Sequence, residues 1–194
     1  MRTAADIERA HAPERPRGRW LGPAAIVVSL LVTVFGGYVA AAALEEPAGR
    51  PLSVAGAVRV QPLTAWQVAG RYEAGGVPGA RLTRGSGNLD VLAAPFSGTV
   101  SSLARSYADR VLRPGARVQI SPGLERVHTA SGHTAGRFSY VGVFDRGGSP
   151  IEGEVTVVVS SAGTGVVFDA WAPEGLLQYV RGDIATMEAN AEIA

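Results

Sequence analysis

The sequence contains no cysteine and no lysine. Without cysteine the chain can form no disulfide, no thiolate metal site and no lipid anchor of the kind that acylates a cysteine. Without lysine it cannot carry a Walker A phosphate-binding loop. All 18 basic residues are arginine, a bias typical of a GC-rich genome such as that of an actinobacterium.

Clustered positive charge is also missing from most of the chain. The formal net charge is +1, and beyond the first nineteen residues the acidic and basic side chains are interleaved. Nucleic-acid binding requires a basic patch or stripe, so we expect no nucleic-acid partner. The 194 residues suffice for one ordinary domain and an anchor.

One long stretch, from Trp20 to Leu44, carries no charge. A helix needs about 20 apolar residues to cross a hydrocarbon core of about 30 Å, so this stretch is long enough to span a membrane. Five arginines precede it, whereas two glutamates and one arginine follow it closely. The positive-inside rule then predicts a cytoplasmic tail at residues 1–19, a transmembrane helix at 20–44 and an extracytoplasmic C-terminal part.

Two other interpretations of this stretch remain open. A buried core helix of this length and apolarity is improbable. A cleaved signal peptide is the stronger alternative, because the run from Ala40 to Ala43 offers small-residue cleavage sites. Either a signal or an anchor leaves the following domain outside the cytoplasmic membrane.

The remainder divides into a linker at residues 45–56, rich in proline, glycine and alanine, and a domain at residues 57–194. Alternating apolar and polar residues predict strands, with one face of the later strands buried and the other largely wet. The predicted strands occupy residues 58–66, 66–72, 80–83, 89–93, 124–130, 137–144, 151–160 and 164–171.

Two segments have helical periodicity instead. In residues 99–112 an apolar stripe runs from Val100 to Val111, with Ser97 or Thr99 available as a cap. In residues 173–192 a second stripe follows Pro173 and Glu174, residue types that suit a first helical turn. Two striped helices and a sheet must bury against one another, so the fold class is α+β.

This order of elements resembles the PsbP-like α/β/α sandwich, found in photosynthetic lumenal proteins and in bacterial, including actinobacterial, envelope proteins. The resemblance covers residues 57–194 and includes the segment VVFDAWAPEGLL at residues 166–177. It implies an antiparallel sheet packed by two amphipathic helices, and an accessory or binding protein rather than an enzyme. It implies no role for any particular residue.

Few side chains suggest chemistry. Asp169, Trp171 and Glu174 lie where the last strand meets the last helix, and tryptophan is enriched at binding hot spots. The plainer alternative places Trp171 in the core and Glu174 beside a helix N-terminus. His128 and His133 are five residues apart across a Ser-Gly break, which is a poor basis for a zinc site. The sequence therefore predicts no cofactor and no metal.

We expect a membrane-anchored, non-catalytic accessory or binding domain of the cell envelope. Its expected partner is the bilayer, and another envelope membrane protein is a second candidate partner. One alternative is an envelope hydrolase acting through Asp169, Glu174 or His128. A second alternative is a transmembrane assembly or signalling subunit whose inner contact is made by residues 1–19. The hydrolase alternative requires two or more of Asp169, Glu174 and His128 to lie in one pocket.

Overall fold

The computed structural model describes residues 49–114, 116–129, 132–144 and 149–194. The predicted tail at 1–19, the predicted span at 20–44 and most of the predicted linker lie outside the described residues. Within the described ranges, no helix combines the length and the apolar character that crossing a membrane requires.

Eight strands form the large sheet, all paired antiparallel, in the order β3-β4-β5-β10-β9-β8-β6, with β7 also paired to β8. Their bounds are β3 Gln67–Ala74, β4 Val77–Arg84, β5 Gly87–Pro95, β6 Ala116–Ile120, β7 Glu125–His128, β8 Thr134–Phe144, β9 Ile151–Val159 and β10 Thr164–Pro173. The predicted strands at residues 80–83 and 89–93 are confirmed as parts of β4 and β5, which pair as a hairpin. β6 was not predicted, since its sequence ARVQI offers only a short alternation.

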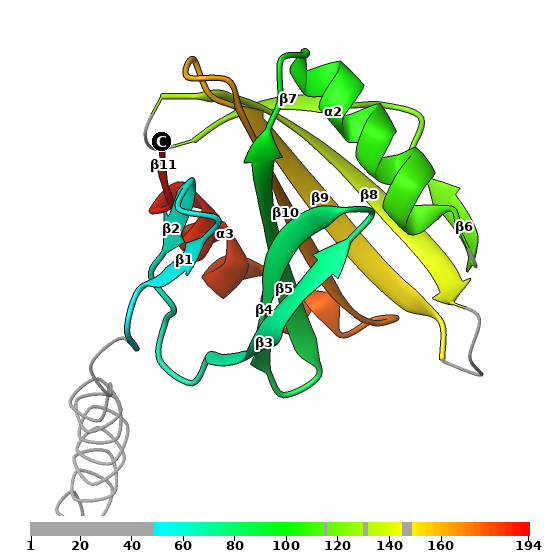
Figure 1. Cartoon of the computed structure of the whole chain (residues 1–194). Coiled ribbons are helices and arrows are strands. Elements are labelled where there is room, and N and C mark those ends of the chain that lie inside the picture. The colour runs from blue at the N-terminus through cyan, green and yellow to red at the C-terminus, as the bar shows by residue number, and fades with distance from the viewer. Residues whose placement is uncertain (1–48, 115, 130–131, 145–148) are drawn as a thin grey trace, which may run out of the picture. The chain divides into compact units, whose positions relative to one another are not determined.

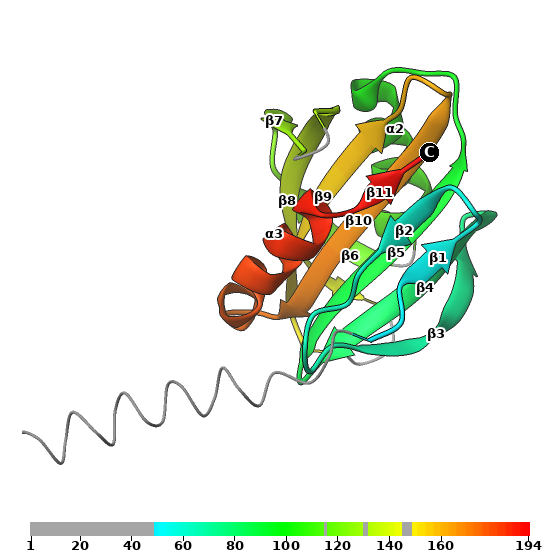
Figure 2. The ribbon, with the colours of Figure 1, turned by 90° about the vertical axis from the view of Figure 1, so that its left-hand side faces the viewer.

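Both faces of the large sheet are covered. Helix α2 (Val100–Tyr107) lies on one face, while helix α3 (Arg181–Ala189) lies on the other beside a small sheet of β1, β2 and β11 (Figures 1 and 2). Thr156 of β9 was expected on a wet face but is only 3% exposed. The expectation of one largely wet face is therefore wrong, because α3 and the small sheet cover the face opposite α2.

Helix α2 begins at a capping box. The Thr99 Oγ1 accepts a hydrogen bond from the Ser102 N–H at 3.1 Å, and the Ser102 Oγ accepts one from the Thr99 N–H at 2.8 Å. After Tyr107 the helix widens into the π-helical segment η2 (Ala108–Leu112), where the Arg113 N–H donates to the Ala108 carbonyl at 3.0 Å. This wider turn buries Leu112, five residues after Tyr107, on the same side of the helix.

The predicted helix at residues 173–192 is wrong in its start and its end. Strand β10 continues to Pro173, which pairs with Ile151 of β9. A turn at Gly175 (φ +82°) leads to the 3₁₀ segment η3 (Leu177–Tyr179), and the Leu177 N–H donates to Glu152 Oε1 at 2.8 Å. Helix α3 follows, and the chain then forms β11 (Glu192–Ile193) against β2.

The N-terminal part of the described chain also differs from expectation. Strand β1 (Leu52–Val54) lies within the segment predicted to be a linker, and it pairs with β2 (Val58–Val60) through a turn at Ala55 and Gly56. The strand predicted at residues 58–66 therefore ends at Val60, shortly before Pro62, whose ring lacks the N–H that a ladder needs.

A polar network holds α3 against the large sheet. Glu188 of α3 is buried, and its Oε2 accepts hydrogen bonds from Thr156 Oγ1 at 3.0 Å and from the Arg137 guanidinium at 3.1 Å. Arg137 also forms an ion pair with Glu154. Burial raises the pKa of Glu188 to about 7, and the charge of Arg137 opposes this rise. These contacts join β8 and β9 to α3 on this face.

Candidate functional site

The register of the central strands brings two buried carboxylates together on the α2 face. Asp90 of β5 lies directly opposite Asp169 of β10, and Arg81 of β4 lies directly opposite Asp90. Side chains that face each other across an antiparallel pair lie about 5 Å apart at Cβ. Asp90 and Asp169 are 5% and 4% exposed. Two acids in so dry a place need compensating partners.

The negative charge of Asp90 is neutralised by the Arg81 guanidinium. Arg81 binds it with two hydrogen bonds, Nε to Oδ1 at 2.7 Å and Nη2 to Oδ2 at 2.8 Å, and Trp171 Nε1 donates to the same Oδ2 at 2.9 Å. The Arg81 guanidinium lies 5.0 Å from the centre of the Trp171 ring and 5.4 Å from that of Tyr72. Paired charge and aromatic contact fix this arginine in one position.

Asp169 is bound by two phenols instead. Tyr107 of α2 donates to Oδ2 at 2.5 Å, and Tyr140 of β8 donates to Oδ1 at 2.9 Å. Tyr140 reaches across β9 because Gly153 has no side chain: a Cβ at this position would lie 2.2 Å from the tyrosine ring. The site thus depends on a glycine of β9, the strand that lies between Tyr140 on β8 and its target Asp169 on β10.

Burial shifts the pKa values of the Asp169 carboxyl and of the two tyrosines that bind it. Burial raises the pKa of Asp169 to about 7, the charge of Asp90 adds to the rise, and the hydrogen bonds from Tyr107 and Tyr140 oppose it. Burial and the nearby Asp169 also raise the pKa values of both tyrosines above the ordinary phenol value. The phenols therefore remain donors while the Asp169 carboxyl titrates near neutral pH.

The hydrogen-bonding capacity of the network is used internally. In the described part of the chain, no buried side-chain nitrogen or oxygen lacks a partner. Nor do three histidine, aspartate or glutamate side chains gather anywhere in the described ranges in a way that could hold a metal ion. The network therefore serves as a rigid, satisfied floor.

Above this floor a cleft runs between α2 with η2 and the large sheet, and we call it the α2 cleft. It consists of two adjoining cavities that share Ala74, Tyr107 and Val111 in their walls. The aromatic cavity, about 300 Å³, is lined by Tyr72, Ala74, Arg81, Asp90, Tyr107, Val111, Leu112, Tyr140, Phe144, Ser149, Ile151, Asp169 and Trp171.

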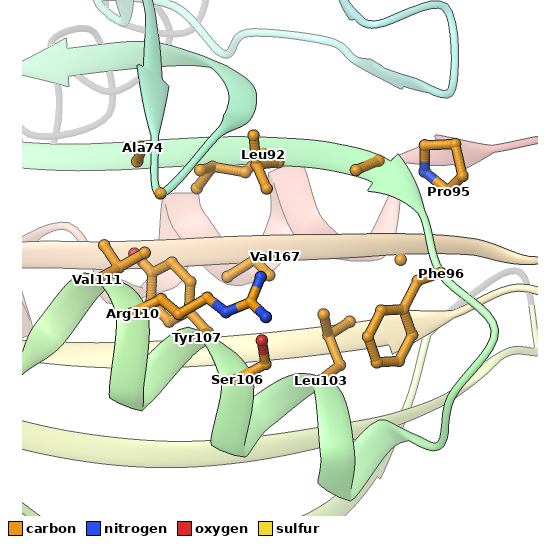
Figure 3. Close-up of a pocket in the computed structure, with 14 residues that line it drawn as sticks. Ala74, Leu92, Pro95, Phe96, Leu103, Ser106, Tyr107, Arg110, Val111 and Val167 are labelled. Atoms are coloured by element: carbon orange, nitrogen blue, oxygen red, sulfur yellow. The ribbon is translucent and has the colours of Figure 1, made fainter.

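The second or helical cavity, about 200 Å³, has mostly apolar walls. Leu92 and Val167 of the sheet face Leu103 and Val111 across it, with Phe96 beyond the end of β5 (Figure 3). Its polar members, as drawn in Figure 3, are Ser106, Tyr107 and Arg110, all from the helix. The α2 cleft thus offers apolar walls with a few polar groups, as is usual for ligand sites.

The structure separates the four predicted contact residues. Asp169 and Trp171 are both part of the polar floor, and Trp171 also packs at the edge of the core on the α2 face. Glu174 lies at another cavity near β6, and His128 lies at a third near the start of α2. Glu174 is exposed and does not begin a helix. The residues proposed for a hydrolase therefore do not converge.

Sequence reasoning did not identify Arg81 and Asp90 as residues of this site. It also did not identify Tyr72, Tyr107 and Tyr140 as their neighbours. One local signal was present: Asp90 interrupts the apolar run Leu89 to Ala93 of a predicted strand. A lone acid in such a run is costly unless it is paired, and so it marks a polar contact in the core.

Comparisons with known proteins concern the fold. No protein-family model and no curated protein matches the chain. The solution structure of the cyanobacterial PsbP protein CyanoP, from Synechocystis sp., is similar with a TM-score of 0.52 and 14% identity, covering 78% of this chain and 99% of CyanoP. A Pseudomonas aeruginosa protein of unknown function, PA94, described as a putative regulator, has a TM-score of 0.41 and 12% identity, covering 72% of this chain and 93% of PA94.

The likeness to CyanoP shows that the chain has a PsbP-like fold: α+β, with a mostly antiparallel sheet and two helices. This part of the predicted fold class is confirmed. At 14% identity the likeness extends to the fold alone.

The raised pKa of Asp169 predicts a pH-dependent stability. Between the ordinary carboxyl pKa of 3.8 and about 7 the native state binds a proton that the unfolded chain has released, so stability falls as pH rises through this window. We expect the Asp169 carboxyl to account for a loss of about 2–3 kcal/mol in the free energy of unfolding between pH 5 and pH 8. Urea unfolding of the wild type and of Asp169→Asn measures this difference. Equal pH slopes in the two proteins would contradict the assignment.

The contact between Gly153 and Tyr140 predicts the effect of one methyl group. Gly153→Ala places a Cβ in the space of the Tyr140 ring and should destabilise the fold by about 1–3 kcal/mol while displacing the phenol from Asp169. Gly70→Ala, also in a strand, meets nothing within 4 Å and serves as the control. Thermal unfolding measures the loss of stability. The pH dependence of the free energy of unfolding shows whether the Tyr140 phenol has left Asp169. A Gly153→Ala protein as stable as the Gly70→Ala protein would refute the packing argument.

Proposed function

We propose that this chain is a membrane-anchored binding domain of the cell envelope, with its binding site in the α2 cleft. Residues 20–44 are the anchor, residues 1–19 are the cytoplasmic tail and the described domain is held outside the membrane. The uncharged stretch and the five arginines before it support this topology. The α2 cleft, a preformed apolar groove over a fixed polar floor, is the observation that carries the binding role.

Binding rather than catalysis is favoured by how the floor is built. A general acid or base must come within hydrogen-bond reach of the substrate. Asp169 is covered by Tyr107 and Tyr140, and Asp90 is occupied by Arg81 and Trp171. A ligand in the α2 cleft meets aromatic rings and aliphatic walls first. Such walls increase the affinity because they bury apolar surface of the ligand, while the fixed polar groups hold the cleft in one shape.

The two helices are attached to the large sheet in different ways, and this difference determines on which face a ligand can bind. On its other face, α3 is held by the Arg137 and Glu188 contacts and by Trp66, whose Nε1 donates to Asp183 at 2.9 Å. Helix α2 is attached differently: among the described residues it is held by apolar packing and by the hydrogen bond from Tyr107 to Asp169. The α2 side is therefore the side at which a cavity can remain open without loosening the core.

Blocking the α2 cleft tests its role. Ala74 lines both cavities near the rim, so Ala74→Trp should fill the junction and remove bound material without unfolding the domain. Ala69→Trp adds the same side chain to an exposed position of the same strand, outside both cavities. We expect small molecules that co-purify with the full chain from native membranes, measured by mass spectrometry, to be lost only from the Ala74→Trp protein. Equal recovery from both variants would refute a binding site in the α2 cleft.

A reporter pair tests the topology. Alkaline phosphatase fused after Ala194 should be active in intact cells, and green fluorescent protein fused at the same residue should be dark, because the first folds only outside and the second only inside the cytoplasmic membrane. Replacing the five arginines of residues 1–19 with glutamine should weaken this orientation. A fluorescent C-terminal fusion would refute the extracytoplasmic placement.

A further inference from the structure

The helical cavity carries a positive charge at its mouth. Arg110 extends from η2 along the cavity, and the Ser106 hydroxyl, one helical turn earlier, points into the same space (Figure 3). Residues four apart on a helix are neighbours on one face, so a single small group can reach both side chains. Both belong to the wall of the cavity, which is otherwise mostly apolar.

Of the arginines that the structure describes, some form ion pairs and others, Arg110 among them, do not. Arg81 pairs with Asp90, Arg84 with Asp183, and Arg113 with Asp109, one helical turn before it. Among the described residues, Arg110 has no carboxylate within ion-pair distance. Its guanidinium can therefore receive an anion from outside the chain.

The α2 cleft is poorly suited to bind a cationic ligand. Aromatic walls and buried acids can bind cations, but here the aromatic contact is already taken by Arg81, which lies over both Tyr72 and Trp171. The Asp90 charge is matched by Arg81, and both oxygens of Asp169 accept from tyrosines. The charge that remains uncompensated at the α2 cleft is the positive one of Arg110.

The walls define the rest of the ligand. Leu92, Leu103, Val111 and Val167 face the interior of the helical cavity, with Phe96 at its far end. A cavity of about 200 Å³ holds a short apolar chain rather than a large ring system. Its continuation into the aromatic cavity gives such a chain room to extend past Tyr107.

We propose that the helical cavity binds an amphiphile with one anionic group. Its apolar chain lies against Leu92, Leu103 and Val167, and its carboxylate or phosphate is bound by the Arg110 guanidinium and the Ser106 hydroxyl. This inference rests on the proposed function, because it names the ligand class of the same cleft. The anion can belong to a free fatty acid or to a membrane lipid, and the two share the chemistry that Arg110 recognises.

The probe is sodium octanoate, with octanol and octylammonium as matched neutral and cationic chains. The full chain is held in phosphatidylcholine nanodiscs, since detergents are themselves amphiphiles, and binding is measured calorimetrically against empty discs. We expect octanoate to bind at least about tenfold more tightly than octanol or octylammonium. Arg110→Gln should remove this preference, whereas octanol binding should stay unchanged in the same variant.

Arg105→Gln is the control, because Arg105 lies on the same helix, is exposed and lines a different cavity beside β8. It removes the same charge from the helix and should leave octanoate binding unchanged. Discs containing phosphatidylglycerol identify the source of the anion: a lipid ligand competes with octanoate in the wild type, and a free acid does not. Either result supports the inference.

The contrary results separate the two proposals. Equal binding of all three chains, or an equal loss in Arg105→Gln and Arg110→Gln, overturns the anionic ligand while leaving the α2 cleft as a binding site. No binding of any chain also overturns it, and the proposed function then stands only if material sensitive to Ala74→Trp still co-purifies. If neither is found, both proposals fail.

Discussion

The α2 side of this domain depends on one constraint, the side-by-side placement of Asp90 and Asp169 on the two central strands. Two carboxylates cannot both stay charged and unpartnered in so dry a place. Arg81 neutralises the first, while two tyrosines and a raised pKa accommodate the second. Much of the local composition follows: Trp171 completes the coordination of Asp90, and Gly153 clears the path of Tyr140.

The two faces of the large sheet use buried polar groups for different ends. Beneath α3, the Arg137, Thr156 and Glu188 contacts join a helix to two strands. Beneath α2, the polar groups lie at the bottom of a cavity, and the Tyr107 hydroxyl joins the helix to them. One face is thus joined to its helix by several polar contacts, and the other contains the α2 cleft.

How far the sequence predicts this fold depends on the range of each interaction. Alternation located most strands, and Thr99, one of the two predicted caps, is the N-cap of α2; both succeed because strand faces and helix caps are local. The apolar stripe of the predicted last helix began at Leu176. Its members Leu177, Val180, Ile184 and Met187 are buried as their spacing indicated, but Leu176 is 39% exposed and Pro173 belongs to β10. A 3₁₀ turn followed by a short helix preserves helical spacing, so periodicity alone could not place the start. The pairing of Asp90 with Asp169 depends on the register of strands far apart in the chain, which no local pattern encodes.

A charged floor is an uneconomical way to stabilise the α2 face. A buried ion pair gains little over apolar residues of the same volume, because desolvation offsets most of the attraction. Apolar side chains in place of Arg81, Asp90 and Asp169 would pack the α2 face without needing three tyrosines and a tryptophan to satisfy them. Those partners instead hold the floor in a single geometry, with Arg81 fixed between two rings. For the proposed binding role this arrangement matters, because a cleft that is already formed loses less binding energy to ordering itself.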